Sequence, residues 1–243
     1  MLLYYITDSW QFSGDKDERR SRLLENIEEA ARCGVDLIQL RERDLSPGEL
    51  ESLASDAVTR VRKQSATTMV LINSRVDVAI ASGVGGVHLR SALDLSASEA
   101  RNIFHKAGAT SATVCVSCHT LQDVYAAEAH GADFAVFGPV FGKVISGSDF
   151  ISKAKELPGV GIAKLYEVCH REAAASSRMP VLALGGVNLK NAGECLNSGA
   201  AGIAAIRLFQ PADLRELEST VAALRKNACL LAESAERRHP YQS

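Results

Sequence analysis

The sequence has little excess charge and lacks a long apolar run. Its 243 residues carry 27 Lys and Arg against 29 Asp and Glu, a net charge of −2. A protein that binds nucleic acid or an anionic membrane through its overall charge is more basic than this. No apolar stretch reaches the roughly 20 residues of a membrane-spanning helix. The start, MLLYYITDSW, also lacks the basic region and apolar length of a signal peptide. We therefore expect a cytoplasmic protein without nucleic-acid or membrane partners, and the sequence leaves its oligomeric state open.

The cysteines do not have the spacing of a zinc site. Six are present, and in a reducing compartment we expect free thiols. One stretch, CVSCH at 115–119, fits the C-x-x-C-H signature of haem attachment. Successive side chains alternate faces on a strand, so Cys115 and Cys118 should point to opposite sides. Two thiols so placed cannot bind one haem edge, and the stretch is interpreted as a strand.

Short apolar runs alternate with helical patterns along the whole chain. Alternation of this kind predicts parallel strands joined by helices. Eight such units predict a (β/α)8 TIM barrel as a single domain over 1–243, with a polar tail from about 232. The alternative is an open doubly wound sheet, which is weakened because no G-x-G-x-x-G follows the first strand. The predicted strands begin at Leu2, Val35, Thr68, Gly85, Thr113, Asp133, Pro180 and Ala201.

Two segments between the strands have distinct sequence signals. Ser46, Pro47 and Glu49 have the residue types and spacing of a capping box with proline at the first helical position. The segment 141–161 is rich in Gly, Ser and Lys, and we expect a long loop there, after the sixth strand.

Functional residues of a (β/α)8 barrel lie at the carboxyl ends of its strands. Gln39, Arg41 and Arg43 share one face of the second predicted strand, and Asn73 ends the third. Two guanidinium groups beside two amides predict a binding site for an anion such as a phosphate. The alternative is a pair of rim arginines that bind the neighbouring acidic side chains, Glu42 and Asp44.

A second phosphate site is predicted where the seventh and eighth strands end. Gly185 and Gly186 let backbone amides approach a ligand, and a helix expected to start near Asn188 adds its positive end. The eighth strand ends at Ile206 and Arg207, which lie beside that loop in this type of barrel. The alternative is a tight turn without a ligand.

The fifth strand ends in a histidine suited to acid–base chemistry. Ser117 and His119 share a face there, and imidazole titrates near neutral pH. The alternative for His119 is a rim histidine that only forms hydrogen bonds. His88, within GVHLR, has the same alternative and less to support a role.

Five stretches together resemble the thiamine phosphate synthase/TenI family, in order and across almost the whole chain. They are YYITD, GVDLIQLRER, LINSRVDVAIASGVGGVHL, VSCHTLQDVYAAEAHGADFAVFGPVF and VLALGGVNLKNAGECLNSGAAGIAAI. The family is a (β/α)8 barrel of thiamine biosynthesis. Its synthases join hydroxymethylpyrimidine diphosphate to a thiazole phosphate and release diphosphate, with Mg²⁺. Its TenI-type members bind the thiazole and, where active, isomerise a thiazole carboxylate with a histidine as acid and base.

The resemblance assigns roles to nine positions. Gln39, Arg41, Arg43 and Asn73 match pyrimidine and diphosphate contacts, Ser117 matches a pyrimidine contact, and His119 matches the tautomerase histidine. The thiazole-phosphate cradle is matched by Gly186, Ile206 and Arg207.

Several departures affect the metal. Synthases have a lysine where this chain has Arg43, an aspartate where it has Ser74, and H-x-G-Q-x-D where it has HLRSALD. Their T-x-[ST]-K loop is missing, and Lys143 is a loose substitute. Asp94 is then the one carboxylate that could bind a metal, and a diphosphate leaving group needs Mg²⁺ for charge neutralisation.

The sequence therefore favours a TenI-type thiazole tautomerase that needs no cofactor, with His119 as its catalytic residue. One alternative is a thiamine phosphate synthase that uses Mg²⁺ and both phosphorylated substrates. The other is a non-catalytic, regulatory protein that binds the thiazole phosphate.

Overall fold

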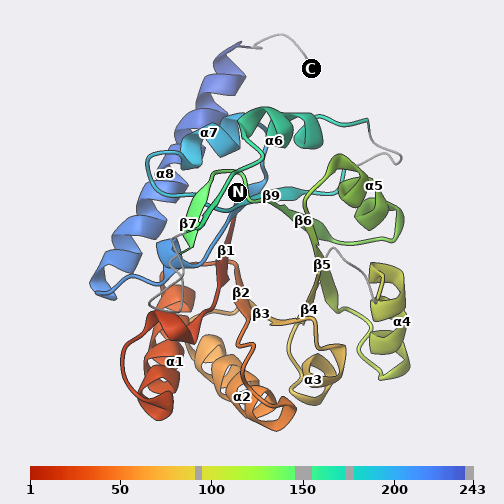
Figure 1. Ribbon diagram of the computed structural model, residues 1–243, viewed down its shortest axis with the longest axis vertical. Helices are drawn as coiled ribbons and strands as arrows, with labels where there is room; N and C mark the ends of the chain where they lie inside the picture. The colour runs from red at the N-terminus through yellow and green to blue at the C-terminus, as the bar shows by residue number, and fades with distance from the viewer. Residues whose placement is uncertain (91–94, 146–154, 173–177, 239–243) are drawn as a thin grey trace.

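The chain folds as a closed parallel barrel ringed by helices (Figure 1), which confirms the predicted (β/α)8 fold. The computed structural model describes residues 1–90, 95–145, 155–172 and 178–238. Each barrel strand pairs with the next one along the chain, and β10 closes the barrel on β1 with Leu2 opposite Gly202. The barrel strands are β1 (Leu2–Ile6), β2 (Leu37–Leu40), β3 (Met69–Asn73), β4 (Gly86–Leu89), β5 (Thr113–Cys118), β6 (Phe134–Phe137), β9 (Val181–Leu184) and β10 (Gly202–Ala205).

The helices pack around the outside of the barrel. Those of the described residues are α1 (Lys16–Arg32), α2 (Pro47–Gln64), α3 (Val76–Ala81), α4 (Ala97–Lys106), α5 (Leu121–Ala129), α6 (Ile162–Cys169), α7 (Ala192–Asn197) and α8 (Arg215–Arg238), with short 3₁₀ turns η1 (Ser9–Gln11) and η2 (Arg207–Phe209). The predicted capping box on α2 is confirmed, because Ser46 and Glu49 bond each other's backbone N–H. Boxes of the same kind start α1, α4 and α5. None of the described helices is both long and apolar enough to cross a membrane.

Two apolar clusters divide the core. The larger one lies between the strands and the helices and includes Cys118. The smaller one fills the barrel interior and includes Cys115, Tyr4 and Phe134. The two cysteines of CVSCH therefore point to opposite faces of β5 as predicted, and both are free thiols.

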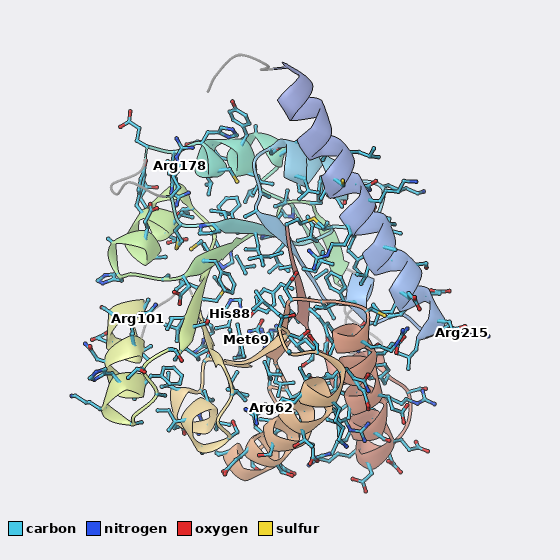
Figure 2. The ribbon with its side chains drawn as sticks, turned by 180° about the vertical axis from the view of Figure 1, so that it is seen from behind. Arg62, Met69, His88, Arg101, Arg178 and Arg215 are labelled. Atoms are coloured by element: carbon cyan, nitrogen blue, oxygen red, sulfur yellow. The ribbon has the colours of Figure 1, made fainter. Side chains whose placement is uncertain are left out.

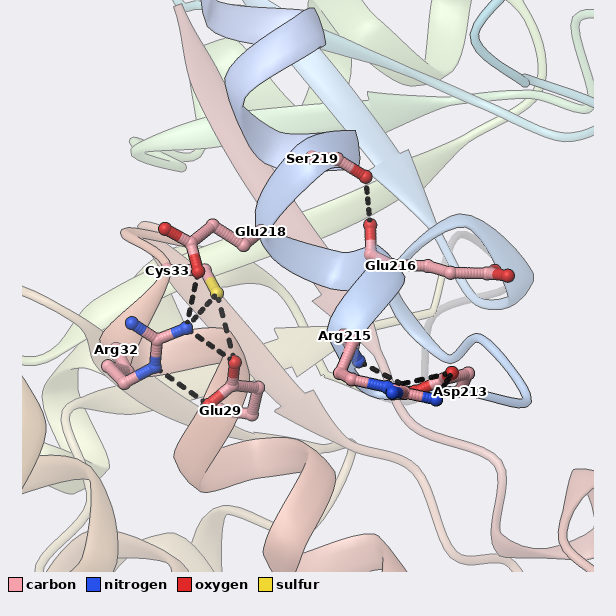
Figure 3. Close-up of polar contacts among 8 residues, drawn as sticks. All are labelled: Glu29, Arg32, Cys33, Asp213, Arg215, Glu216, Glu218 and Ser219. Carbon is pink, nitrogen blue, oxygen red and sulfur yellow. Dashed lines mark hydrogen bonds and ion pairs between the residues drawn. The ribbon is translucent and has the colours of Figure 1, made fainter.

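The barrel's first and last elements are tied together by Arg225 of α8. Its guanidinium donates to the carbonyls of Met1 and Gly34 and to the carboxylate of Asp36 at 2.7 Å. Asp36 in turn accepts the backbone N–H of Leu3 at 2.6 Å. A second contact joins α1 to α8 at the surface, where Arg32 bonds both Glu29 and Glu218 (Figure 3). Both sets of contacts hold α8 against the start of β1 and the end of α1.

A buried ion pair anchors the segment that leads into β9. Arg171 donates to both carboxylate oxygens of Glu128, at 3.2 and 2.9 Å. It also donates to the carbonyls of Val168 and Met179, and the Met179 N–H donates to Glu128 at 2.7 Å. The Arg171 side chain is 1% exposed and that of Glu128 is 10% exposed. This pair fixes the chain just before the strand that carries Gly185 and Gly186.

The structure corrects four of the predicted boundaries. Within the predicted loop 141–161, β7 (Lys143–Ile145) and β8 (Lys155–Leu157) form an antiparallel ribbon, and residues 146–154 lie outside the described residues. The helix expected near Asn188 begins at Ala192, because Asn188 and Asn191 form a turn first. The tail from 232 continues α8 to Arg238, since alanine, glutamate and arginine favour helix. The eighth barrel strand ends at Ala205, and Arg207 starts η2.

Candidate active site

Four polar side chains line one half of the barrel interior near the strand ends. They come from the adjoining strands β2, β3, β4 and β5, as Gln39, Asn73, His88 and Ser117. Gln39 donates to Asn73 Oδ1 at 2.9 Å, and His88 Nε2 lies 2.7 Å from Ser117 Oγ. The opposite half is apolar and is formed by side chains such as Val136, Leu184 and Ile206. The interior therefore suits a ligand with one polar edge and one apolar side.

Gln39 has an acceptor without a partner. The side chain is 1% exposed and lies on the same face of β2 as Leu37, which belongs to the interior cluster. Its amide nitrogen is used by Asn73, but its Oε1 is buried without a hydrogen bond from any described residue. Buried polar atoms are nearly always paired, so an orphan acceptor at a site indicates a donor that arrives with the ligand.

Arg41 and Arg43 follow β2 directly at the mouth of the barrel. Arg41 is half-buried and Arg43 is exposed, and neither forms an ion pair with a described residue. Burial, then the nearby Arg43 charge, lowers the pKa of Arg41 from its usual value. The predicted alternative of a rim ion pair is therefore absent among the described side chains. Two neighbouring cations that pair with no carboxylate of the described residues favour an anionic ligand.

Glu42, between these arginines, holds the loops after β1 and β2 in place. Its carboxylate accepts the Thr7 hydroxyl on one oxygen and the Ser9 N–H on the other at 3.0 Å. The Thr7 hydroxyl oxygen also accepts the Arg41 N–H at 3.0 Å. Glu42 is 5% exposed. It is thus a buried structural carboxylate, and it leaves Arg41 free to bind a ligand.

His119 lies just past the end of β5. Asp123, in the first turn of α5, accepts the backbone N–H of His119 at 2.8 Å. The Nδ1 atom of the His119 ring bonds the carbonyl of Gly138, just after β6. A carbonyl only accepts, so Nδ1 carries the proton and a neutral ring presents Nε2 as a base. The side chain is exposed, and its bond to Gly138 separates it from Ser117, which bonds His88.

The loop after β9 turns on two adjacent glycines. Gly185 and Gly186 have positive φ angles of 97° and 65°. A Cβ on Gly186 would come within 2.7 Å of Phe141, so glycine is required for the close packing of this loop on the chain after β6. The N–H groups of Gly186 and Val187 donate to no described residue. Arg207 starts the turn that follows β10, and its Nε donates to Gln11 Oε1 at 3.4 Å.

The described residues do not fit a divalent-metal site. They contain no group of three or more His, Cys, Asp or Glu side chains that could bind a metal ion. Ser74, which follows Asn73, has a positive φ of 61° and a buried hydroxyl without a partner. Asp94, the one carboxylate predicted as a metal ligand, lies outside the described residues.

The comparisons with known proteins decide the family. The sequence model described as thiamine monophosphate synthase matches residues 3–209. The chain belongs to the thiamine monophosphate synthase/TenI family. Its curated relatives in this family include a thiamine-phosphate synthase of Chlorobium luteolum, 35% identical over 79% of this chain and 82% of that protein. Another, from Methanoculleus marisnigri, is 34% identical over 84% of this chain and 85% of its own length.

Solved structures agree with this family assignment. The thiamine phosphate pyrophosphorylase of Pyrococcus furiosus superimposes with a TM-score of 0.70 and 26% identity, covering 93% of this chain and 95% of that one. A 3-hexulose-6-phosphate synthase, at 18% identity and a TM-score of 0.55, shares the fold only. The relatives are named as synthases and not as TenI proteins, so they favour the synthase alternative over the tautomerase that the sequence analysis placed first.

Sequence reasoning overlooked Tyr4 and did not predict the contacts of His88 and Glu42. Tyr4 and His88 form a buried hydrogen bond of 2.8 Å inside the barrel, and Glu42 holds the loops after β1 and β2. The alternation of GVHL, with Gly86 and His88 on one face, was the signal that pointed His88 inward. No sequence signal pairs Tyr4 with a residue 84 positions away.

Proposed function

We propose that the protein is a thiamine-phosphate synthase, which joins hydroxymethylpyrimidine diphosphate to a thiazole phosphate and releases diphosphate. The observation that carries this proposal is the orphan Oε1 of Gln39, which is buried beside Asn73. Arg41 and Arg43 follow on the same segment and form no ion pair within the described part of the chain. An aminopyrimidine edge supplies a donor for that oxygen, and its diphosphate supplies the anion for Arg41 and Arg43. The names of the relatives support the same activity.

Each part of the site then has a task. Gln39, Asn73 and Ser117 orient the pyrimidine, while the amides of Gly186 and Val187 hold the thiazole phosphate, with Arg207 adding charge. As the new bond to the thiazole forms, the carbon–oxygen bond to diphosphate breaks and its electron pair leaves with the diphosphate. Arg41 and Arg43 offset that developing negative charge.

Mg²⁺, when bound, would neutralise the departing diphosphate. The described side chains do not fit such an ion, so in the proposed reaction Arg41 and Arg43 neutralise the diphosphate.

The direct test is formation of thiamine phosphate from the two substrates, measured by chromatography with and without Mg²⁺. We expect product with the wild type and a rise of at least about tenfold in KM for the pyrimidine diphosphate in Arg41→Gln, since a charge-assisted hydrogen bond is lost. Arg62→Gln, the same change at an exposed arginine of α2, is the matched control and should not alter KM. Absence of product at every Mg²⁺ concentration would overturn the proposal.

A second candidate is the thiazole tautomerase, favoured by the open Nε2 of His119 and by the absence of a metal cluster among the described residues. Proton NMR of the thiazole carboxylate phosphate would follow isomerisation directly. We expect no acceleration if the protein is a synthase only. Acceleration that is lost in His119→Asn would support the tautomerase, and calorimetric binding without turnover in either assay would identify a non-catalytic binder.

A further inference from the structure

A chain of three hydrogen-bonding groups runs from the barrel interior to its mouth. The Tyr4 hydroxyl on β1 lies 2.8 Å from His88 Nδ1 on β4, and His88 Nε2 lies 2.7 Å from Ser117 Oγ on β5. Tyr4 is 0% exposed and His88 is 2% exposed. Figure 2 shows His88 in the middle of the barrel. Ser117 is partly exposed, so this chain connects a dry interior to the ligand site.

The proton of Tyr4 fixes the direction of the first bond. Tyr4 sits in the apolar cluster of the barrel interior, with the edge of the Phe134 ring against it at 5.8 Å between centroids. Burial raises the pKa of Tyr4 well above its usual value, so the hydroxyl keeps its proton. Within the described part of the chain, His88 is the hydroxyl's one hydrogen-bond partner. Tyr4 must therefore donate to Nδ1, because the reverse direction would leave its proton unpaired in a dry interior.

The direction of the second bond follows from the first. A neutral imidazole whose Nδ1 accepts a hydrogen bond carries its proton on Nε2. Burial, then the Arg41 charge, lowers the pKa of His88 to about 3, so the ring is neutral at physiological pH. Nε2 therefore donates to Ser117 Oγ. The hydroxyl proton of Ser117 has no acceptor among the described residues and is left to point into the mouth.

We propose that His88 is a positioning residue, held by Tyr4 as the Nε2–H tautomer so that Ser117 acts as a hydrogen-bond donor to the substrate. The acceptor that fits is a lone pair such as a pyrimidine ring nitrogen, which rests on the proposed function. Without this constraint, Ser117 could donate to His88 instead and present only its own lone pairs to the ligand, which would repel such an acceptor.

The tautomer is tested first, by nitrogen NMR of the full chain labelled with [¹⁵N]histidine. His88 should give the signature of a protonated Nε2 and an unprotonated Nδ1, unchanged between about pH 8 and pH 5. Tyr4→Phe removes the donor to Nδ1 and should produce a mixture of tautomers. A wild-type spectrum with Nδ1 protonated would overturn the proposal, whatever reaction the protein catalyses.

Two amide substitutions then separate positioning from packing. The amide nitrogen of His88→Gln reaches about as far as Nε2 and can still donate to Ser117, whereas that of His88→Asn ends near the position of Nδ1. For hydroxymethylpyrimidine diphosphate we expect the kcat/KM of His88→Gln to stay within about threefold of wild type. The kcat/KM of His88→Asn should be roughly tenfold lower, because that variant loses one neutral hydrogen bond to Ser117. KM for the thiazole phosphate should not change in either.

Equal losses in both variants, with cooperative unfolding retained, would show that His88 only packs. If the wild type forms no thiamine phosphate, the proposed function fails while the NMR result still decides the tautomer. If His88→Asn does not fold, Tyr4→Phe supplies the comparison, with a smaller loss in kcat/KM for the pyrimidine substrate that matches the fraction of Nε2–H tautomer lost in its NMR spectrum.

Discussion

Replacing Glu128 by glutamine tests whether the buried ion pair holds the approach to β9. The change keeps the shape of the side chain and one acceptor oxygen for the Met179 N–H. It removes the charge opposite Arg171, whose side chain is 1% exposed. The guanidinium would keep its bonds to the carbonyls of Val168 and Met179, but its charge would be buried without a counter-ion.

The cost follows from that burial. Removing one partner of a buried ion pair destabilises a protein by about 3–5 kcal/mol, because the remaining charge is uncompensated. For a chain of this size each 1 kcal/mol lowers Tm by roughly 2–4 °C. We therefore expect Glu128→Gln to lower Tm by about 6–20 °C. An exposed pair is worth at most about 1 kcal/mol, since water already solvates both of its charges.

The assay is thermal and urea unfolding of the full chain, with Glu167→Gln as the matched control. Glu167 pairs with Lys164 on α6, and their side chains are 46% and 63% exposed. The control should shift Tm by no more than a few degrees. Equal shifts in the two variants would refute the argument from burial. A small shift for Glu128→Gln alone would mean that Arg171 reaches solvent.

Three further outcomes are expected. In the folded protein, burial lowers the pKa of His88 to about 3, below its unfolded value of about 6.5. Between these two values the unfolded state binds a proton at His88 that the folded state does not. The contribution of neutral His88 to folding stability is therefore complete above about pH 6.5 and is lost as the pH falls toward 3. Urea unfolding from pH 7 to 4 should therefore be less pH-dependent in His88→Gln than in the wild type. Glu42→Gln places an amide NH₂ against the Thr7 hydroxyl or the Ser9 N–H, and should cost about 1–3 kcal/mol in urea unfolding and raise KM for the pyrimidine diphosphate. Gly186→Ala, at φ 65° and against Phe141, should cost about 1–3 kcal/mol and raise KM for the thiazole phosphate; an unchanged KM would place that phosphate elsewhere.

The barrel was predictable because its signals are local. Each strand is an apolar run bounded by Gly or polar residues, and the Ser46 capping box marks a helix start within four residues. The β7–β8 ribbon was missed because Gly- and Ser-rich composition predicts a loop whether or not two short strands pair within it. The end of β10 was placed too late, since Ile206 and Leu208 continue the apolar pattern while the backbone turns into η2.

The candidate site was predictable only in part, for a related reason. Strand ends locate Gln39, Asn73 and Ser117 correctly, because barrel geometry sends all carboxyl ends to one mouth. The partners that decide their state come from elsewhere in the chain. Tyr4 and His88 are 84 positions apart, and Glu42 and Thr7 are 35 apart. Contacts of this kind depend on which strands become neighbours in the barrel. A local sequence pattern does not predict that neighbourhood.

The seam between β1 and β10 also has a consequence for synthesis. β1 leaves the ribosome before every other barrel strand, but its partner on one side ends at Ala205, and Arg225, which bonds the Met1 carbonyl, lies further on. At about 5–20 residues per second, this edge waits roughly 10–40 seconds for its partner. A chain stopped before residue 202 would have two open sheet edges, β1 and β9. Such edges pair readily with other chains. The addition of β10 and α8 therefore closes the barrel and also removes the edges through which an incomplete chain would aggregate.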